Sequence, residues 1–184
     1  MEEISKDTLI KASQGDMQAF EEVYKASSSF VYNVAYRVVN NREDALEVAQ
    51  EVFMIIHDKL KTFRFESSFK TWTYRITANY AINFAKKLSR SKTVPYEDAF
   101  GEGAVLNEVE TQIDQEHQSQ LVDKLLAELN PDQRACVVLR DIQGLSYEEI
   151  AQTLNININT VRSRLKRSRE KLLSIRKKVD YEKV

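Results

Sequence analysis

The sequence is poor in helix-breaking residues and in the side chains that usually bind metal ions. Its 184 residues include only four glycines, two prolines, two histidines and one cysteine. Glycine and proline interrupt helices, so their scarcity, together with apolar residues that recur at helical spacing, predicts an all-α protein. One cysteine and two histidines do not make up a zinc site, so we expect no bound metal.

Long apolar runs are also missing. No run approaches the roughly 18 residues that span a bilayer, and no signal peptide opens the chain. We therefore expect a cytoplasmic protein that does not insert into membranes. The single cysteine, Cys136, lies in the apolar run ACVVL, which is typical of a small core residue rather than of a nucleophile or a metal ligand.

The charges are distributed in blocks, although the net charge is only −1. The net charges by segment are −6 for residues 1–58, +8 for 59–92, −7 for 93–118, −3 for 119–159 and +7 for 160–184. Two separate basic blocks favour two contacts with nucleic acid. The acidic block between them contains a proline and two glycines, which predicts a flexible acidic linker over 93–117. We therefore expect two small helical domains, at 1–92 and 118–184.

The stretch from Ser146 to Leu172 has the pattern of a helix-turn-helix. Ser146 can cap a first helix, and Glu149, three residues later, can reach back to complete a capping box. Asn155 stands at the expected turn, and asparagine adopts the left-handed conformation more readily than most residues that have a side chain. A second helix is predicted from about Thr160.

The second helix has one packing side and one basic side. The packing side consists of Val161, Leu165, Ser168 and Leu172. The opposite side consists of Arg162, Ser163, Lys166 and Arg167, and the flanks carry Arg164, Arg169 and Lys171. Such a helix can enter the major groove of duplex DNA and present its donors to base edges. The alternative is a basic face that is merely solvated, as isolated runs of charge usually are.

Two further helices are expected ahead of this motif in the second domain. One carries Leu121, Leu125 and Leu129, and the next begins at the sequence Asn130-Pro131-Asp132-Gln133. Asparagine as the cap, proline at the first helical position and a glutamine that can complete the box predict a helix start. Gly144 ends that helix, and the pair would support the helix-turn-helix.

The first domain is expected to contain a helix at Asp7–Ser13, a second capped by Asp16, a third at Phe30–Val39 and a fourth at Arg42–Leu60. The fourth helix has an inward apolar side and an outward acidic side. The outward side includes Asp44, Glu47, Gln50 and Glu51, with Met54 among them. An acidic face is often only solubilising, but an exposed methionine at its centre favours contact with another protein.

Aromatic and basic residues are interleaved between Lys61 and Lys87. Lys61–Ser67 is predicted to be a loop, and a helix is expected from Phe69 to Leu88. Aromatic rings stack on unpaired bases while cations hold the phosphates between them, so this stretch favours binding of single-stranded nucleic acid. A core helix with one solvated side is the alternative.

Several motifs in this order resemble those of the extracytoplasmic-function (ECF) sigma factors, small alternative sigma factors of bacterial RNA polymerase in the sigma-70 family. QGDMQAFEEVY is similar to the opening of the family's second region, REDALEVAQEVF to its polymerase-binding helix, and SSFKTWTYRITANYAIN to its promoter-melting helix. LNPDQRACVVLRDIQGLSYEEIAQTLNININTVRSRLKRSREKL is similar to its fourth region. The chain departs from the family at the turn NININT, where the family often has Gly-Ile-Pro-x-Gly-Thr, and at Glu47-Val48-Ala49, where it usually has Asp-Leu-Val.

The resemblance implies a factor with no catalytic site, no cofactor and no small-molecule substrate. Its partners would be core RNA polymerase, promoter DNA in both duplex and single-stranded form, and an anti-sigma factor that holds it inactive. The basic side of the second helix would read the minus-35 element as duplex, and its flanks would strengthen binding to DNA of any sequence. The second region would capture the minus-10 element as a single strand.

The resemblance also assigns residues in the second region. Phe63 and Asn79 match the family's pocket for a base flipped out of the minus-10 element. By the residue pattern itself, Trp72 belongs to an apolar sector of the same helix, Asn83 lies on or beside that sector, and Lys86 and Lys87 would hold the backbone. The alternative is that Asn79 only caps or solvates the helix surface. Asp44, Glu47, Gln50 and Glu51 match the family's motif that binds the clamp of core polymerase, and Met54 lies beside them.

Two other classes of protein stay open on the sequence alone. A stand-alone helix-turn-helix regulator would bind its operator tightly without help. An interaction module, such as an adaptor on polymerase, would have no DNA specificity. Run-off transcription with purified core polymerase on a mixed promoter library separates these classes from a sigma factor.

Overall fold

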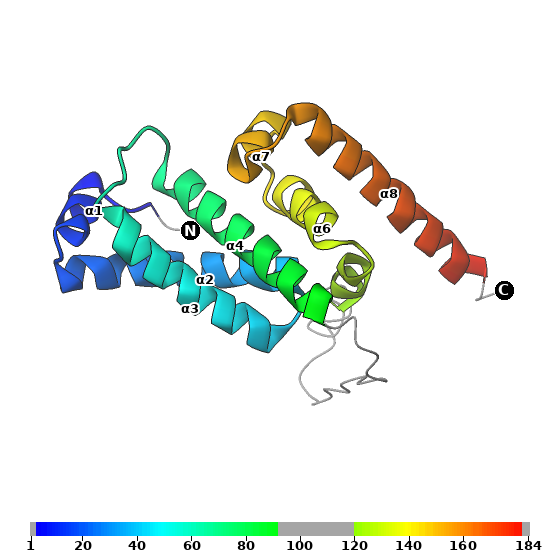
Figure 1. Ribbon diagram of the computed structural model, residues 1–184, viewed down its shortest axis with the longest axis horizontal. Helices are drawn as coiled ribbons and strands as arrows, with labels where there is room; N and C mark the ends of the chain where they lie inside the picture. The colour runs from blue at the N-terminus through cyan, green and yellow to red at the C-terminus, as the bar shows by residue number, and fades with distance from the viewer. Residues whose placement is uncertain (1–2, 92–119, 182–184) are drawn as a thin grey trace, which may run out of the picture.

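The computed structural model describes residues 3–91 and 120–181, so the linker expected at 93–117 lies outside the described residues. All regular structure in these two ranges is helical, as the sequence predicted, and Figure 1 shows the helices in two groups. The first group comprises α1 (Lys6–Ser13), α2 (Met17–Val39), α3 (Arg42–Leu60) and α4 (Phe69–Ser91). The second comprises helical residues 120–127, α6 (Pro131–Val137), the π-helix η1 (Val138–Ile142), α7 (Tyr147–Leu154) and α8 (Ile158–Tyr181).

Side-chain caps fix where the long helices of the first group begin. Asp16 Oδ1 accepts hydrogen bonds from the backbone N–H groups of Gln18 and Ala19, at 2.9 and 3.0 Å, and so starts α2. Asn41 Oδ1 accepts from the N–H of Asp44 at 3.0 Å and starts α3. These N–H groups have no partner inside their helices, so the caps supply the missing acceptors.

Helix α2 runs unbroken through the serine-rich stretch, where the sequence predicted a break before a separate helix at Phe30–Val39. Ser27 is buried, and its hydroxyl donates to the carbonyl oxygen of Val23 in the preceding turn. Because the hydroxyl is satisfied within the helix, serine does not interrupt it here. The helix ends at Asn40, which has a left-handed φ of 61°.

The inward side predicted for α3 is largely confirmed. Ala45, Val48, Val52, Ile56 and Leu60 are all buried. Ala49, which was also predicted to face inward, is only partly buried, and the buried Phe53 was not predicted. The aromatic ring of Phe53 packs on Tyr24 of α2, with ring centroids 4.5 Å apart, which turns this side of α3 toward α2.

Two capping boxes start α6 and α7, and both were predicted. Asn130 Oδ1 accepts from the N–H of Gln133 at 2.9 Å, and Gln133 Oε1 accepts in return from the N–H of Asn130 at 3.3 Å. Ser146 and Glu149 make the same reciprocal pair, at 3.1 and 2.7 Å. Between these boxes the helix widens into η1, which the sequence did not indicate, and Gly144 follows with a φ of 75°.

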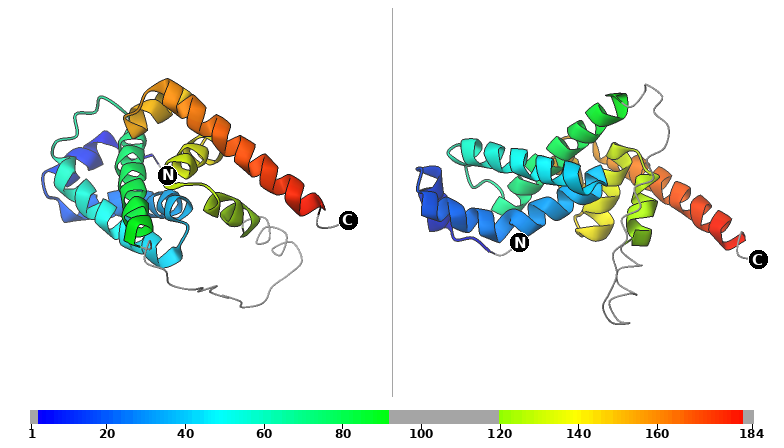
Figure 2. Two further views of the ribbon diagram at one scale, coloured as in Figure 1. Left: turned by 45° about the vertical axis from the view of Figure 1, so that its right-hand side comes forward. Right: turned by 90° about the horizontal axis from the view of Figure 1, so that it is seen from below.

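The two groups of helices pack against each other. Helix α4 lies against α6 and α7, and α2 lies against α6. The buried side chains of both groups form one continuous hydrophobic cluster. Figure 2 shows α8 extending beyond these contacts toward the C-terminus.

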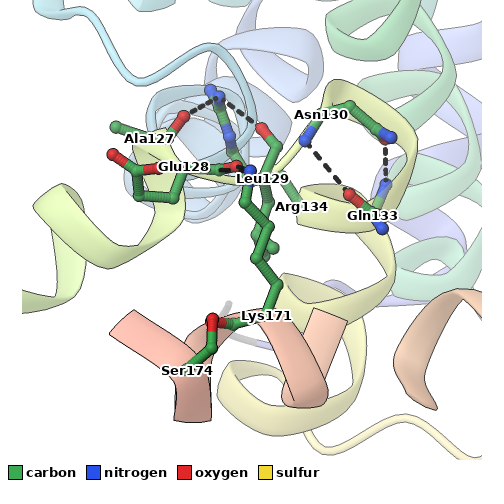
Figure 3. A network of polar contacts seen from close by, with 8 residues as sticks. All are labelled: Ala127, Glu128, Leu129, Asn130, Gln133, Arg134, Lys171 and Ser174. Carbon is green, nitrogen blue, oxygen red and sulfur yellow. Dashed lines mark hydrogen bonds and ion pairs between the residues drawn. The ribbon is translucent and has the colours of Figure 1, made fainter. Parts of the chain in front are cut away.

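Arg134 connects the two groups through a buried guanidinium group. Its Nη1 donates to the carbonyl oxygen of Val38, near the end of α2, at 3.0 Å. Its Nη2 donates to the carbonyl oxygens of Leu129 and Ala127, at 2.9 and 3.4 Å, as Figure 3 shows. Burial lowers the pKa of Arg134. Carbonyl groups at helix ends lack partners within their own helix, so one guanidinium completes the ends of helices from both groups.

Candidate nucleic-acid interface

Helices α7 and α8 form the predicted helix-turn-helix. Helix α7 ends at Asn155, which adopts the left-handed conformation with a φ of 51° and a ψ of 50°. Asn157 Oδ1 then accepts a hydrogen bond from the backbone N–H of Asn159 at 2.8 Å. Because Asn157 acts as the cap, α8 begins at Ile158 and not at the predicted Thr160.

The packing side of α8 is as predicted. Val161, Leu165 and Ser168 are buried, and Leu172 is half-buried. Ser168 is tolerated there because its hydroxyl donates to the carbonyl oxygen of Arg164 at 2.7 Å. The first turns of α8 are therefore fixed in rotation, which determines which side chains face solvent.

The opposite side of α8 is exposed. It carries the four residues predicted to reach base edges, Arg162, Ser163, Lys166 and Arg167. Arg162 Nη1 donates to Asn159 Oδ1 at 3.0 Å, and Lys166 Nζ lies 3.9 Å from a carboxylate oxygen of Glu170. Arg167 makes no ion pair with any residue that the structure describes. This side thus presents three cations that no buried acid neutralises.

The three flanking cations contact acidic or carbonyl groups of the second group of helices. Arg164 lies 3.1 Å from Asp132, Arg169 lies 2.9 Å from Asp141, and Lys171 donates to the carbonyl oxygen of Glu128 (Figure 3). Arg164 has a quarter of its side chain exposed, at 25%, whereas Arg169 is about half exposed, at 48%. The flanks and the exposed side of α8 therefore differ in environment, as well as in direction.

A groove between α3 and α4 brings together three residues predicted to contact a single strand. Trp72, Asn79 and Asn83 line it, and its volume is about 390 Å³. Phe63 does not line the groove, but its ring packs on Trp72 with the ring centroids 5.1 Å apart. Tyr80, also from α4, lines the groove as well. Apolar rings and side-chain amides in one groove are suited to stacking with a base and hydrogen bonding to its edge.

The amide of Asn79 is engaged by the second group of helices. Its Nδ2 donates to the carbonyl oxygen of Arg75, in its own helix, at 2.7 Å. It also donates to the carbonyl oxygen of Thr153, in α7, at 2.8 Å. Helix α7 thus lies at the edge of the groove and holds one of its polar groups.

Asp132 links cations that were predicted to contact two different DNA elements. One carboxylate oxygen lies 2.7 Å from Lys86 Nζ in α4, and the other lies 3.1 Å from Arg164 in α8. Lys87, the neighbouring cation predicted to hold the single-stranded backbone, is exposed. The structure therefore does not place Lys86 and Lys87 in the same environment.

Two tyrosine hydroxyls add contacts between the groups. Tyr36 donates to Asp123 at 2.8 Å, and Tyr74 donates to Gln143 Oε1 at 2.7 Å. Tyr74 is 2% exposed, and burial raises its pKa to about 12, with a further contribution from the negative charge of Glu149. Neither contact had a signal in the local sequence.

The outward side of α3 is exposed at Glu47, Gln50 and Met54 and half-buried at Asp44 and Glu51. Burial raises the pKa of Tyr80 in α4, and the charges of Glu51 and Glu47 raise it further. The acidic side of α3 therefore reaches the edge of the groove that holds Trp72, Asn79 and Asn83.

An apolar groove of about 1010 Å³ runs between α2 and α3 beside this acidic side. Its walls include Tyr24, Leu46, Phe53 and Met54, of which Leu46 and Met54 are 62% and 49% exposed. Sequence reasoning found Met54 but missed Leu46 and Tyr24. The sequence did carry a signal for Leu46. It is an apolar residue that lies outside the inward apolar stripe of α3.

Neither a metal site nor a membrane segment is found in residues 3–91 and 120–181. No three histidine, cysteine, aspartate or glutamate side chains in this part of the chain gather closely enough to hold a metal ion. None of the described helices has the length and apolar character to cross a bilayer. Cys136 is buried, as predicted for a core residue, and burial raises the pKa of its thiol.

Two parts of the chain match family models, both of sigma-70 regions. Residues 23–91 match Sigma-70 region 2, and residues 119–172 match Sigma-70, region 4. The ECF RNA polymerase sigma-E factor of Haemophilus influenzae is 33% identical over 180 residues, which cover 92% of this chain and 94% of that protein. The ECF RNA polymerase sigma-E factor of Escherichia coli K12 is 34% identical over 178 residues, which cover 92% and 93%.

Two solved structures share the fold over both groups of helices. CnrH, in complex with the cytosolic domain of CnrY, has a TM-score of 0.65 and 21% identity, covering 92% of this chain and 94% of that chain. The sigma factor RpoE from Bartonella quintana, in complex with the anti-sigma factor NepR, has a TM-score of 0.64 and 24% identity, covering 88% and 98%.

Proposed function

The chain belongs to the ECF group of the sigma-70 family of RNA polymerase sigma factors, and from this premise we propose how its surfaces divide the recognition of a promoter. It is an alternative sigma factor that directs transcription initiation, and it is not an enzyme. We propose that region 2 occupies residues 1–92 and region 4 occupies 118–184, with the linker at 93–117 between them.

Region 4 would read the minus-35 element with α8. The observation that carries this role is the rotation of the helix, which buries Val161 and Leu165 and leaves Arg162, Lys166 and Arg167 exposed. The first turns of a recognition helix reach base edges in the major groove, and arginine binds guanine there through two hydrogen bonds. Ser163, on the same side, donates its hydroxyl to the carbonyl oxygen of Thr160 at 3.0 Å and keeps its acceptor capacity for a donor on a base.

The flanking cations would bind phosphates and carry no sequence information. Arg164, Arg169 and Lys171 point to the sides of α8, where the DNA backbones pass a helix in the major groove. Their partners in the free protein are oxygen atoms, so each is already placed to bind an anionic oxygen. Exchange of these partners for phosphates would fix the register of the helix.

Region 2 would capture the minus-10 element as a single strand in the groove between α3 and α4. Trp72, supported by Phe63, offers an apolar surface to a flipped base, and Asn79 and Asn83 offer amide groups to its edge. Lys86 and Lys87 would hold the strand's phosphates.

The structure corresponds, on this proposal, to the form of the factor that is not bound to DNA. Asn79 donates to Thr153 of α7, and Lys86 pairs with Asp132. The Nδ2 group of Asn79 and the ammonium group of Lys86 must leave these partners before they can donate to a strand. Promoter recognition would therefore require region 4 to move away from region 2. The minus-35 and minus-10 elements are separate on the DNA, which also requires the two regions to lie apart.

The acidic side of α3 would bind the clamp of core polymerase. Asp44, Glu47, Gln50 and Glu51 supply acceptors for basic side chains, and Met54 supplies an adaptable apolar contact. The neighbouring groove, with the exposed Leu46, would extend this contact. A surface that combines an apolar centre with a polar rim is typical of a protein interface.

We also propose an anti-sigma factor as a partner and the cytoplasm as the location. The solved structure of RpoE contains the anti-sigma factor NepR. This chain shares that fold, so an anti-sigma factor would bind it in the same way to keep it inactive. The location follows from the partners, because core polymerase and promoter DNA are in the cytoplasm.

Run-off transcription with purified core polymerase on a mixed promoter library tests the function. We expect transcripts from a subset of templates that share both a minus-35 and a minus-10 sequence. Tight binding to one operator without polymerase, and no initiation, would instead identify a stand-alone regulator. Binding to polymerase without selection among promoters would identify an adaptor.

A further inference from the structure

Asn159 lies on the DNA-reading side of α8, one turn before the residues already assigned to it. It precedes Arg162 by three positions and Ser163 by four, and residues at these spacings are neighbours on one side of a helix. Asn159 is exposed and belongs to the first turn of α8. The first turn is the part of a recognition helix that comes closest to base edges.

The side chain of Asn159 holds the guanidinium of Arg162. Arg162 Nη1 donates to Asn159 Oδ1 at 3.0 Å. The backbone of Asn159 is itself fixed, because its N–H donates to Asn157 Oδ1 at 2.8 Å. A long exposed arginine is thus tied to a helix end that has little freedom. Less rotamer entropy remains to be lost when such a side chain binds a base.

The chemistry of the partner matters, because an amide fixes the guanidinium without neutralising it. The other partnered cations that precede residue 176 on α8 each have a carboxylate within 4.0 Å, which reduces the local positive charge; they are Arg164, Lys166, Arg169 and Lys171. Arg162 keeps its full charge and has donors left over, since a guanidinium has five N–H groups and Asn159 takes one. Two of the remaining donors are enough for the acceptors on the edge of a guanine.

We propose that Asn159 is a positioning residue that determines the specificity of Arg162 for one base pair of the minus-35 element. It acts through Arg162 and holds the guanidinium in the orientation that two hydrogen bonds to guanine require. The chain has asparagine here, where the family pattern at this turn often has glycine, which has no side chain to make this contact. The proposal rests on the proposed role of α8 in reading the minus-35 element.

The test is a double-mutant cycle in the full-length chain bound to core polymerase, read on duplex promoters randomised in the minus-35 element. Asn159→Ala should reduce the preference for guanine at one position by roughly 2- to 12-fold, the range that one net hydrogen bond supplies. Arg162→Ala should remove that preference. In the Arg162→Ala background, adding Asn159→Ala should change the preference no further, because its effect passes through the arginine.

Two more variants separate positioning from other roles. Asn159→Asp keeps the acceptor, so it should retain the base preference while its negative charge weakens binding to all sequences. Ser174→Ala, at an exposed position further along α8, should leave the preference unchanged. Alanine is a better helix former than asparagine and Asn157 still caps the helix, so thermal melting should show that Asn159→Ala folds.

Three results would overturn the inference. They are an unchanged base preference in Asn159→Ala, an equal loss of binding on all sequences in Asn159→Ala, and an effect of Asn159→Ala that persists in full without Arg162. If the unmodified chain with core polymerase selected no minus-35 sequence at all, the proposed role of α8 would fail first. The control arm with the unmodified chain therefore distinguishes the two failures.

Discussion

The side-chain amide of Asn79 donates a hydrogen bond to the carbonyl oxygen of Thr153, 2.8 Å away. Asn79 belongs to α4 in region 2, and Thr153 belongs to α7 in region 4, so the contact joins the two regions. A donor that is used in this contact is not available to a base at the same time. Capture of the melted strand and separation of the two regions are therefore linked equilibria.

Asn79→Ala should impair promoter opening. The variant lacks the amide proposed to read a flipped base, and one net hydrogen bond corresponds to a loss of roughly 2- to 12-fold in the open complex. Permanganate footprinting on duplex promoters should show weaker opening and an altered preference at one minus-10 base. Opening should recover in part on pre-melted templates, because the energy of unpairing is then supplied in advance.

Binding to the minus-35 duplex provides the internal control for this variant, because α8 is unchanged and should bind as before. Ser89→Ala, in the exposed last part of α4, should open promoters normally. Unchanged opening together with unchanged base preference in Asn79→Ala would place the strand-reading pocket elsewhere.

Arg167→Ala should relax the sequence preference at one position of the minus-35 element. Arg167 is exposed on the reading side of α8 and makes no ion pair with a described residue. A bidentate contact between arginine and guanine contributes roughly 1–3 kcal/mol of discrimination. Selection of binding sites from a randomised duplex library measures this preference, and an equal loss on specific and scrambled sites would contradict the assignment.

Arg164→Ala and Arg169→Ala should behave differently from Arg167→Ala. Both flanking residues are proposed to bind phosphates, so their loss should weaken binding to all sequences to a similar extent. Binding measured over a range of salt concentrations should depend less steeply on salt in both variants. A change of base preference in either variant would show that the residue contacts a base and not only the phosphates.

Charge reversal on the acidic side of α3 should weaken binding to core polymerase. In the double variant Glu47→Lys, Glu51→Lys, repulsion from a basic clamp should slow association, and lost paired contacts should speed dissociation. Surface plasmon resonance measures both rates. The fold should be retained, because Glu47 is exposed and Glu51 is half-buried.

The matched control carries the same change of charge elsewhere. Glu21 and Glu148 are exposed in α2 and α7, and neither belongs to the acidic side of α3 nor lines the neighbouring apolar groove. The double variant Glu21→Lys, Glu148→Lys should bind core polymerase nearly as well as the unmodified chain. If both double variants lost affinity equally, net charge and not this surface would govern the interaction.

Tyr74→Phe should change how stability depends on pH. Burial raises the pKa of Tyr74 to about 12, above the usual value of 10.0, so the folded chain holds this proton more tightly than the unfolded chain. The stabilisation is fully present below pH 10 and is lost as the pH rises from about 10 to about 12. Two pKa units correspond to at most about 3 kcal/mol.

Urea denaturation at about pH 7 and about pH 11 measures this effect as a difference between two chains. At neutral pH the phenylalanine variant should be less stable by about 1 kcal/mol, because Tyr74 loses its hydrogen bond to Gln143. At high pH the unmodified chain should lose its advantage, since only it has a phenol to ionise. A difference in unfolding free energy that stays constant with pH would contradict the prediction.

Local chemistry in the sequence predicted much of the fold. Capping boxes depend on residues three positions apart, so Asn130 with Gln133 and Ser146 with Glu149 were recognisable without a structure. The orientation of α8 was also predictable, because its apolar residues recur at helical spacing. The serine-rich part of α2 was misread, since whether a serine hydroxyl bonds inside a helix or interrupts it depends on the packing around it.

Contacts between regions were beyond local reasoning. Asp132 was recognisable only as part of a helix start, yet it also holds Lys86 and Arg164. The residues that meet there come from three helices, and no pattern within one helix indicates such a meeting. For the same reason the amide of Asn79 was predicted to face a base, but its contact with Thr153 was not predicted.

The pairing of Asp132 with Lys86 and Arg164 gives this carboxylate the role of an internal counterion. When DNA phosphates replace it, small cations leave the DNA, but the freed aspartate attracts cations from solution. DNA binding then becomes an exchange of cations. The net number of cations released is smaller than the number of phosphates contacted. A count of phosphate contacts from the salt dependence, at about 0.9 ions for each on duplex DNA, would therefore be too low. Promoter complexes of this factor should also survive rising ionic strength better than the charge of its two basic surfaces suggests.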